Sequence, residues 1–498
     1  MTGADPRAAC LIGVATRTWR PEEVGDSGAP EPLAMWAEML EAAAADSGAG
    51  GRALEALGSL AVVHCQTWQY DDPAARLAER LRVAPRRRVY SGMGGTVPYT
   101  LVHDAAEAMR RGDLDVAAVV SGEALATRRA RKRRGEPYRA SFPAAERNPF
   151  PFDVPFHPAE VAHEVFQAYL TFACFDNARR AHLGMALDDY RRRLGELWAR
   201  CSEVAAANPD AWFPRARTLD ELVTPGPENR MVAYPYTKWM VAIMDVDMAA
   251  ALLLATHETA ERLGVPPDRR VYLRGAGYAE DPAYVAEHDE MWRSPAMAHA
   301  GRAALGAAGI GIDDVGHLDL YSCFGSSLHF AADASGLDPT DPRGLTVTGG
   351  LPYHGGPGSG YGTHALATLA RRLRADPGSH GLASGVGMHM TKHAFSCWST
   401  VPPRQAPPPP AAPPAPVRRP LVDRHDGPAT VVAYTVLHDR DGAPTHAVLV
   451  AELPDGARCY ARTEDPERLA AAETRELVGG RVRLRPDERG VNRVVGDG

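Results

Sequence analysis

Four polar or glycine-rich segments hold the side chains that could act as nucleophiles, acids or bases. They are Ser91 in VYSGMGGTVPYT, Cys323 in YSCFGSS, His354 in GGLPYHGGPGSGYG and His393 in SGVGMHMTKHAF. A serine or cysteine activated by a nearby histidine is the machinery of nucleophilic acyl transfer. This set of residue types therefore predicts acyl-transfer chemistry, provided that the fold brings the four segments together.

Each of these side chains also has a structural interpretation. Ser91 is either a nucleophile or a residue that caps a turn, and Cys323 either transfers protons or is a small buried apolar residue. His354 either serves as the base or is a structural loop histidine. His393 either points into a cleft or caps a helix, and His364 on the following helix is a further candidate base.

The sequence predicts no metal site. His389 and His393 have the spacing of paired ligands on a helix, but no acidic residue lies between them and the preceding glycines indicate a loop. The seven cysteines are scattered without a CxxC pair, so neither a zinc site nor a disulfide framework is expected. The segment GGPGSG lacks the Lys-Ser/Thr of a phosphate-binding loop.

The elements that must position these side chains occur twice. RRVYSGMGG, TVPYTLVHDAAEAMRRGDLD and VAAVVSGEA read as strand, glycine turn, helix and strand, and GLTVTGG, THALATLARRLRADPGSH and GLASGVGM repeat that order. Val97, Leu101, Ala105 and Met109 fall on one face of the first helix. We therefore expect an α/β protein with a duplicated core.

A proline-rich segment, 401–420, separates a large body from a small tail. It is expected to be a semi-rigid extended spacer. The body, 1–400, divides into a first half of about 1–265, which includes an insertion at 125–235 expected to cap a cleft at the surface, and a second half of about 266–400. The tail, 421–498, alternates short strands and turns around one helix, which predicts a small β-barrel of the oligonucleotide/oligosaccharide-binding type.

Composition restricts the function classes. The 498 residues are 45% hydrophobic with a net charge of −7, so we expect no nucleic-acid binding. The absence of a signal peptide and of an apolar run of about 18 residues predicts a cytoplasmic protein without a membrane span. The basic run RRARKRRG is either a solvated surface loop or a patch for the phosphates of a ligand or for an acidic carrier protein.

Two further segments resemble the thiolase superfamily. They are AMAHAGRAALGAAGIGIDDVGHLDLYSCF, which is similar to the unit that delivers a thiolase active-site loop, and VAIMDVDMAAALLLATHETAERLG, which is similar to the end of the first thiolase half. With the proline-rich linker and the tail, the chain is similar to actinobacterial type 1 thiolase-like proteins. This resemblance covers about 400 residues and implies a five-layer αβαβα body, a coenzyme A thioester as substrate or ligand, and no further cofactor. It also implies an acyl-CoA or acyl-carrier partner. Thiolases are usually dimers or dimers of dimers, but an exposed appended domain can prevent such assembly, so a homodimer and a monomer both stay open.

The catalytic positions of the family hold other residues here. Ser91 best matches the nucleophilic cysteine, and Tyr321 takes the place of an oxyanion-hole side chain, with Cys323 at the proton-transfer position of the sterol-carrier-type thiolases. The remaining matches concern the cleft that would hold the acyl-CoA. They are Gly355, Gly356 and Pro357 at the Gly-His-Pro motif, where Gly356 replaces the histidine, and Ser384 or Gly385 at the second cysteine motif.

These departures predict an acyl-CoA-binding acyltransferase homologue with a degenerate site. Three alternatives stay open at this stage: an enzyme rewired around serine, cysteine and histidine, a non-catalytic protein that binds acyl-CoA or an acyl carrier, and a scaffold that assembles a partner through the tail. All three predict negligible thiolysis of acetoacetyl-CoA, because serine is a far weaker nucleophile and base than a thiolate.

Overall fold

A nine-stranded sheet forms the centre of the body in the computed structural model, which describes residues 3–145 and 156–497. Five strands of the first half lie in the order β3-β2-β4-β7-β1, and four of the second half in the order β9-β10-β11-β8. The bounds are β1 Ala9–Thr18, β2 Ser59–Val62, β3 Arg87–Tyr90, β4 Val116–Ala124, β7 Asp247–Thr256, β8 Val271–Glu280, β9 Val315–Asp319, β10 His380–Gly387 and β11 Lys392–Ser399. Counted outward from the centre of the sheet, β1, β7, β4 and β2 of the first half correspond to β8, β11, β10 and β9 of the second half. The second half has no strand that corresponds to β3, the outermost strand of the first half. The predicted duplication of the core is confirmed.

The strand missing from the second half is the one predicted at GLTVTGG, and that prediction is wrong. The side chain of Asp319, at the end of β9, accepts hydrogen bonds from the backbone N–H groups of Val347 (3.1 Å) and Thr348 (3.2 Å). These donors are therefore not available to a neighbouring strand. Gly349 and Gly350 follow with φ of 104° and 81°, a left-handed conformation that turns the chain away from the sheet.

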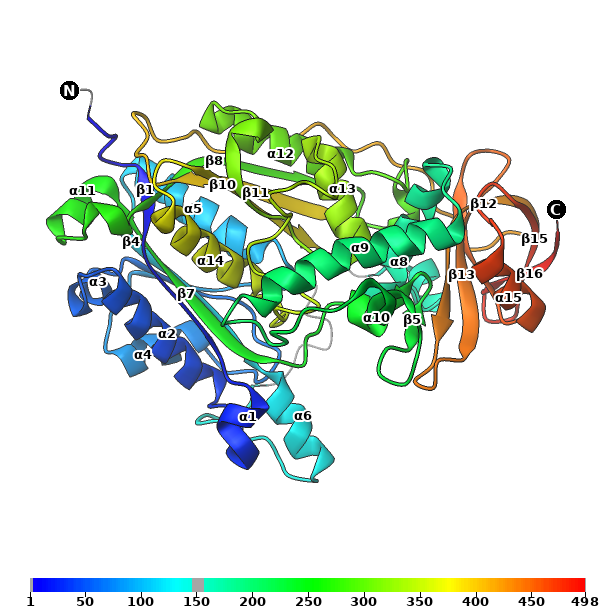
Figure 1. Cartoon of the computed structure of the whole chain (residues 1–498), viewed down its shortest axis with the longest axis horizontal. Helices are drawn as coiled ribbons and strands as arrows, with labels where there is room; N and C mark the ends of the chain where they lie inside the picture. Colours follow the sequence, from blue (N-terminus) through cyan, green and yellow to red (C-terminus); the bar gives the residue numbers. More distant parts are fainter. Residues whose placement is uncertain (1–2, 146–155, 498) are drawn as a thin grey trace.

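Helices and half-sheets alternate in five layers (Figure 1). The central layer is α5 (Val97–Arg111) with α14 (Tyr361–Ala375), between the two half-sheets. The outer layers are α2 (Pro32–Asp46) with α4 (Pro73–Leu81), and α12 (Pro295–Ala308) with α13 (Gly325–Ser335). Helix α5 begins with a proline in its first turn and ends at Gly112, whose left-handed φ terminates the helix. The αβαβα expectation is confirmed.

The segment between β4 and β7 lies only partly at the surface. Its elements are α6 (Leu125–Arg133), α7 (Pro158–Ala162), α8 (Ala168–His182), α9 (Leu187–Ala206), α10 (Leu219–Val223), β5 (Met231–Ala233) and β6 (Tyr236–Thr237). The basic run is part of helix α6, mostly exposed, and is not a loop. Helix α8, by contrast, is buried along most of its length between α13 and the C-terminal barrel. Residues 146–155 of this insertion lie outside the described residues.

The tail forms a closed five-stranded barrel, as predicted. Its strands are β12 (Gly427–His438), β13 (Pro444–Glu452), β14 (Arg458–Thr463), β15 (Arg481–Pro486) and β16 (Asn492–Asp497), with α15 (Pro466–Thr474) between β14 and β15. The order β13-β14-β16-β15-β12 closes through pairing of β12 with β13. The barrel sheet continues into the body, because β5 pairs with β12 through Ala233 and Leu437. The smaller helices are α1 (Pro21–Val24), α3 (Gly51–Glu55) and α11 (His257–Arg262).

The proline-rich segment 401–420 contains no helix, and it is packed on the body. Pro407–Pro410 lie against residues of α5 and β8. The segment is also fixed by hydrogen bonds, because Asp5 N–H donates to the carbonyl of Pro403 (2.9 Å) and Ala406 N–H donates to the Asp5 carboxylate (2.7 Å). It therefore forms a strap along the body.

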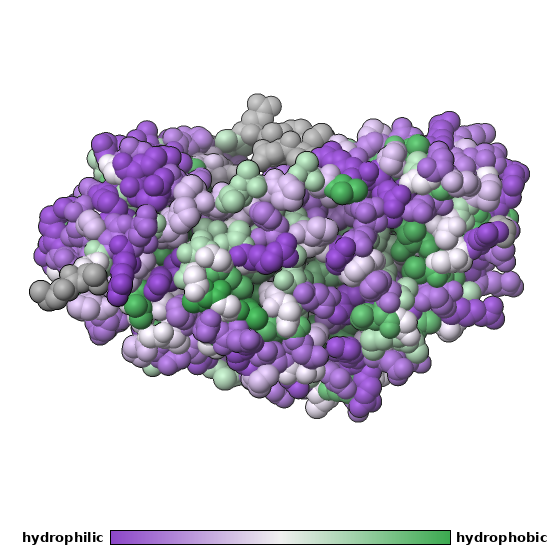
Figure 2. Space-filling model, turned by 90° about the horizontal axis from the view of Figure 1, so that it is seen from above, coloured by the Kyte–Doolittle hydropathy of each residue, from purple (hydrophilic) through white to green (hydrophobic). Residues whose placement is uncertain are grey.

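The surface of the molecule is mostly hydrophilic, with separate hydrophobic patches (Figure 2). The large apolar residues that are exposed lie apart in the sequence, and they are Val161, Phe166, Leu183, Met244, Val401, Val417 and Val495. Over residues 3–145 and 156–497, no helix combines the length and apolarity that crossing a lipid bilayer requires.

Candidate functional site

The structure brings the four sequence segments together at the N-terminal ends of α5 and α14. Gly94 N–H donates to the hydroxyl of Ser359 (3.0 Å), which joins the first segment to the third. Tyr321 N–H donates to the hydroxyl of Ser384 (2.9 Å), which joins the second segment to the fourth. The predicted convergence of these loops is therefore present, and their side chains can be compared in one place.

Ser91 lies at this site, but it does not lie at the start of a helix. It follows β3 and precedes the first residue of α5 by six positions. Its hydroxyl accepts from the N–H of His64 (2.9 Å) and donates to the carbonyl of Gly92 (2.9 Å). Both hydrogen bonds go to backbone groups, so this arrangement supplies no general base to the hydroxyl.

Gly95, and not Ser91, occupies the position that faces the other loops. A Cβ atom built on Gly95 would lie 2.3 Å from the carbonyl oxygen of Val386 and 2.4 Å from the hydroxyl oxygen of Tyr321. Tyr321 is 6% exposed, and its ring packs edge-on against Tyr361 at 5.4 Å. The phenol therefore fills the space that a nucleophilic side chain at position 95 would need.

The second and fourth loops provide a thiol and a hydroxyl that are both buried. Burial raises the pKa of the Cys323 thiol to about 12, so this thiol is protonated at neutral pH. Ser384 accepts the hydrogen bond from Tyr321 N–H and holds β10 against the second loop. Gly385 has no space for a side chain, because its Cβ would lie 2.6 Å from the ring of Tyr99. We conclude that these residues support the packing of the loops.

Two histidines, His354 of the third loop and His364 of α14, are neutral and enclosed. Burial lowers the pKa of His354 to about 4 and holds that of His364 well below its usual range. Their rings lie 5.4 Å apart, and Asn208 Nδ2 lies 3.3 Å from His354 Nδ1. In the described residues, His354 Nε2 and both ring nitrogens of His364 have no hydrogen-bond partner. His354 therefore meets a second histidine and an amide, and not Ser91 or Cys323.

His393 points away from these loops. Its Nε2 lies 2.9 Å from the carboxylate of Asp281 and 3.1 Å from the hydroxyl of Ser294. Ser294 caps α12 by accepting from the N–H of Met297 (2.9 Å). The cap of α12 is thus Ser294 itself, and His393, on β11, contacts that cap side chain without capping a helix of its own. His389 contacts a different group, since its Nδ1 lies 2.8 Å from the hydroxyl of Thr171.

The glycines of the third loop allow close approach of neighbouring chain segments. A Cβ on Gly355 would lie 2.7 Å from the sulfur of Met248, and one on Gly356 would lie 2.9 Å from Leu351. Gly356 N–H donates to the carbonyl of Ile243 (2.8 Å), and the carbonyl of Pro357 accepts from Gly360 N–H (2.8 Å). The loop is thus pinned against the chain segment that precedes β7. Among the described residues, no cluster of three metal-ligating side chains occurs.

Comparisons with known proteins assign the fold. A family described as the additional C-terminal domain of thiolase-like protein type 1 matches residues 409–489. The crystal structure of a monomeric SCP2-thiolase-like protein type 1 from Mycobacterium smegmatis is similar over 99% of this chain and 100% of that one, at 30% identity and a TM-score of 0.84. This chain belongs to the type 1 thiolase-like proteins.

More distant structures share the fold of this thiolase-like protein. The human mitochondrial 3-ketoacyl-CoA thiolase matches with a TM-score of 0.57 at 12% identity, covering 80% of this chain and all of that one. The Ltp2–ChsH2(DUF35) aldolase matches with a TM-score of 0.58 at 17% identity, covering 78% and 98%. No curated protein sequence matches the chain.

A cluster of aromatic and basic side chains that the sequence analysis missed lies beside the third loop of the thiolase-like body. The guanidinium of Arg217 lies 3.4 Å from the ring centroid of Trp239, the ammonium of Lys238 lies 4.9 Å from the same ring, and Phe213 meets it edge-on at 5.4 Å. The cluster adjoins the loop because Phe213 N–H donates to the carbonyl of Tyr353 (2.9 Å). The adjacent aromatic and basic letters in WFPRAR and TKWM are the signal that could have indicated it.

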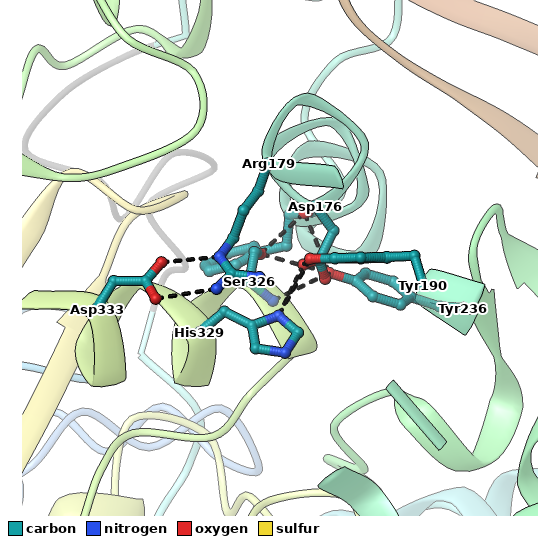
Figure 3. A network of polar contacts seen from close by, with 8 residues as sticks. Asp176, Arg179, Tyr190, Tyr236, Ser326, His329 and Asp333 are labelled. Atoms are coloured by element: carbon teal, nitrogen blue, oxygen red, sulfur yellow. Dashed lines mark hydrogen bonds and ion pairs between the residues drawn. The ribbon is translucent and has the colours of Figure 1, made fainter. Parts of the chain in front are cut away.

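A second missed group is a buried polar network behind the YSCFGSS loop (Figure 3). The carboxylate of Asp176 accepts from the hydroxyls of Tyr190 and Tyr236 and lies 3.1 Å from His329 Nδ1. A Cβ on Gly325, the first residue of α13, would lie 2.7 Å from this carboxylate. The network therefore fixes the start of α13 and, through it, the loop that carries Tyr321.

Proposed function

We propose that this thiolase-like protein binds a coenzyme A thioester beside its third loop and does not carry out thiolase turnover. The observation that supports binding is the cluster of Phe213, Arg217, Lys238 and Trp239. An indole beside a guanidinium and an ammonium offers stacking to a nucleobase and charge-assisted hydrogen bonds to phosphates. A nucleotide-bearing thioester has both groups.

The environment of the ionisable groups supports the absence of turnover. A thiolase-type reaction needs a thiolate nucleophile and a base at neutral pH. Here position 95 is a glycine, and the thiol of Cys323 has a raised pKa. His354 has a lowered pKa and faces Asn208 and His364. A bound thioester would therefore meet no activated group at this site.

The binding part of the proposal is tested by titration calorimetry with coenzyme A and acetyl-CoA. We expect Trp239→Ala and Arg217→Gln each to weaken the affinity by about 10-fold, because a stacked base contributes roughly 1–3 kcal/mol. Trp292→Ala is the matched control, since the Arg293 guanidinium lies 4.8 Å from the Trp292 ring at a different surface. Equal affinity in the Trp239 and Trp292 variants would contradict the assignment of this cluster.

The catalytic part is tested by intact-mass measurement after incubation with acetyl-CoA and malonyl-CoA, and by an assay of acetoacetyl-CoA thiolysis. We expect no covalent acyl adduct and no thiolysis above background. An acyl adduct that disappears in Ser91→Ala or Cys323→Ala would instead establish the rewired acyltransferase and overturn this part of the proposal.

A further inference from the structure

One face of the C-terminal barrel carries three arginines in a row. Arg481, Arg483 and Arg485 alternate along β15 with Val482 and Leu484, which point into the barrel. All three arginines are exposed. Successive outward side chains on a strand lie about 6.8 Å apart, so the three guanidinium groups form a regular ladder of positive charge.

The ladder is poorly neutralised by its own domain. Arg483 lies 3.7 Å from Asp426, but within residues 3–145 and 156–497 neither Arg481 nor Arg485 has a carboxylate within ion-pair distance. Arg485 stands directly opposite Arg493 on β16, and the ion pairs of Arg493 with Glu464 (3.1 Å) and Asp487 (2.9 Å) neutralise that neighbour but not Arg485. Arg481 and Arg485 are therefore available to a partner.

The flanking positions make this face flat. The residues opposite Arg483 are Gly496 on β16 and Pro428 on β12, and Thr430 stands opposite Arg481. None of these three carries a charge or a long side chain. Val495 on β16 is 47% exposed and adds an apolar position at the edge of the ladder. A partner could therefore lie across the ladder without meeting a protruding neighbour.

We propose that this arginine ladder docks an acidic helix of a partner protein. Strand β15 is hydrogen-bonded to β12 and β16 on its two sides, so an extended peptide cannot add to it as a further strand. A helix with carboxylates at every fourth position presents them about 6 Å apart, close to the spacing of the ladder. Each guanidinium can then form a charge-assisted pair with one carboxylate.

The surrounding residues favour a protein partner over a nucleic acid. Barrels of this type bind single strands by stacking bases on exposed aromatic rings. The two aromatic residues of the tail, Tyr434 and Tyr460, are both fully buried. The tail, residues 421–498, also contains fourteen Asp and Glu against eleven Arg, and this excess of acidic groups opposes the approach of a continuous phosphate backbone.

Fluorescence anisotropy at low salt tests the proposal, with the full chain and a labelled alanine-based helical peptide that has glutamate at every fourth position. We expect Arg481→Gln/Arg483→Gln/Arg485→Gln to weaken binding by about 10-fold, since exposed ion pairs contribute roughly 0.2–1 kcal/mol each. The control Arg80→Gln/Arg302→Gln/Arg372→Gln removes the same charge from exposed positions outside the ladder and outside the basic run of α6, and it should change binding by less than about 2-fold.

Several results would overturn the inference. The first is an equal loss of affinity for the glutamate peptide in the two triple variants. The second is a wild-type affinity for the glutamate peptide no higher than that for the same peptide with glutamine. The third is an oligo-dT strand that binds more tightly than the glutamate peptide and loses affinity in the ladder triple variant. The melting temperatures of both triple variants are measured in parallel. If the ladder triple variant melts at a lower temperature than the wild type, the single variant Arg485→Gln takes its place. The single variant should lose about 2-fold in affinity.

Discussion

Gly95→Ala tests whether Tyr321 fills the space beside Gly95 in the thiolase-like site. The added methyl group would lie 2.3 Å from the carbonyl oxygen of Val386 and 2.4 Å from the phenol of Tyr321, and real Cβ atoms essentially never approach other atoms closer than 3.0 Å. The Val386 carbonyl belongs to β10, which is paired with β11, so it cannot move alone. Overpacking of this kind costs about 1–3 kcal/mol, and we expect the upper end.

Tyr321→Ala removes one of the two obstructions and leaves the other. In that background the added methyl group meets only the Val386 carbonyl, so Gly95→Ala should be less destabilising by about 1 kcal/mol. Urea-unfolding midpoints of the wild type, the two single variants and the double variant give this coupling directly. The cost of Tyr321→Ala itself, about 3–5 kcal/mol for a buried aromatic ring, cancels in the comparison.

The matched control is Gly306→Ala in the interior of α12, where an added Cβ has nothing within 4 Å. This substitution should stabilise the helix by up to about 1 kcal/mol. The reasoning would be refuted if Gly95→Ala were as harmless as Gly306→Ala, or if its cost were the same with and without the Tyr321 side chain. Either result would mean that the phenol does not occupy the position.

Three further predictions concern groups away from that contact. Asp176→Asn should lower the free energy of unfolding by about 3 kcal/mol, because an amide cannot accept all three buried hydrogen bonds. In the same urea titration Asp188→Asn, at a 96% exposed carboxylate, should cost less than about 1 kcal/mol. Burial raises the pKa of Asp319 to about 6, so its stabilising contribution is complete below about pH 4 and is lost as the pH rises through 6. The melting temperature should therefore fall between pH 4 and pH 6, and Asp319→Asn should remove the part of this fall that Asp319 causes. Asp5→Ala removes a hydrogen bond that holds the proline-rich strap, and tryptic cleavage after Arg404 should accelerate by about 5-fold; an unchanged rate would show that the strap is held by packing alone.

Local patterns in the sequence predicted most of the fold. The spacing of Val97, Leu101, Ala105 and Met109 placed α5 correctly, because apolar residues at helical spacing mark the face that packs on the core. Ala105 and Met109 are buried there, and Val97 and Leu101 are partly buried against the same core. The strand expected at 344–350 failed because the backbone donors of that segment bind the side chain of Asp319. That contact joins residues about 28 positions apart, and residue spacing alone does not reveal it.

The candidate site was predicted less completely than the fold. The four loops were identified, but a search for hydroxyl and thiol groups selects Ser91 and passes over Gly95, whose importance lies in the side chain that it lacks. The sequence likewise left the environment of His393 open. In the structure Asp281, 112 positions away, lies 2.9 Å from its Nε2. Contacts of this range depend on the folded arrangement of the strands.

The pairing of β5 with β12 has a consequence for how the protein is made. Helix α8 in the body packs against β12, and Asn177 of this helix donates to the carbonyl of Tyr434 (2.9 Å). During translation, 245 positions separate the last residue of this helix, His182, from the first residue of the strand that covers it, Gly427. The nascent chain must therefore keep an apolar helix surface in solution, or on a chaperone, until the barrel has been synthesised. The barrel is thus synthesised after all strands of the nine-stranded sheet, and α8 is covered only when the barrel has folded against it.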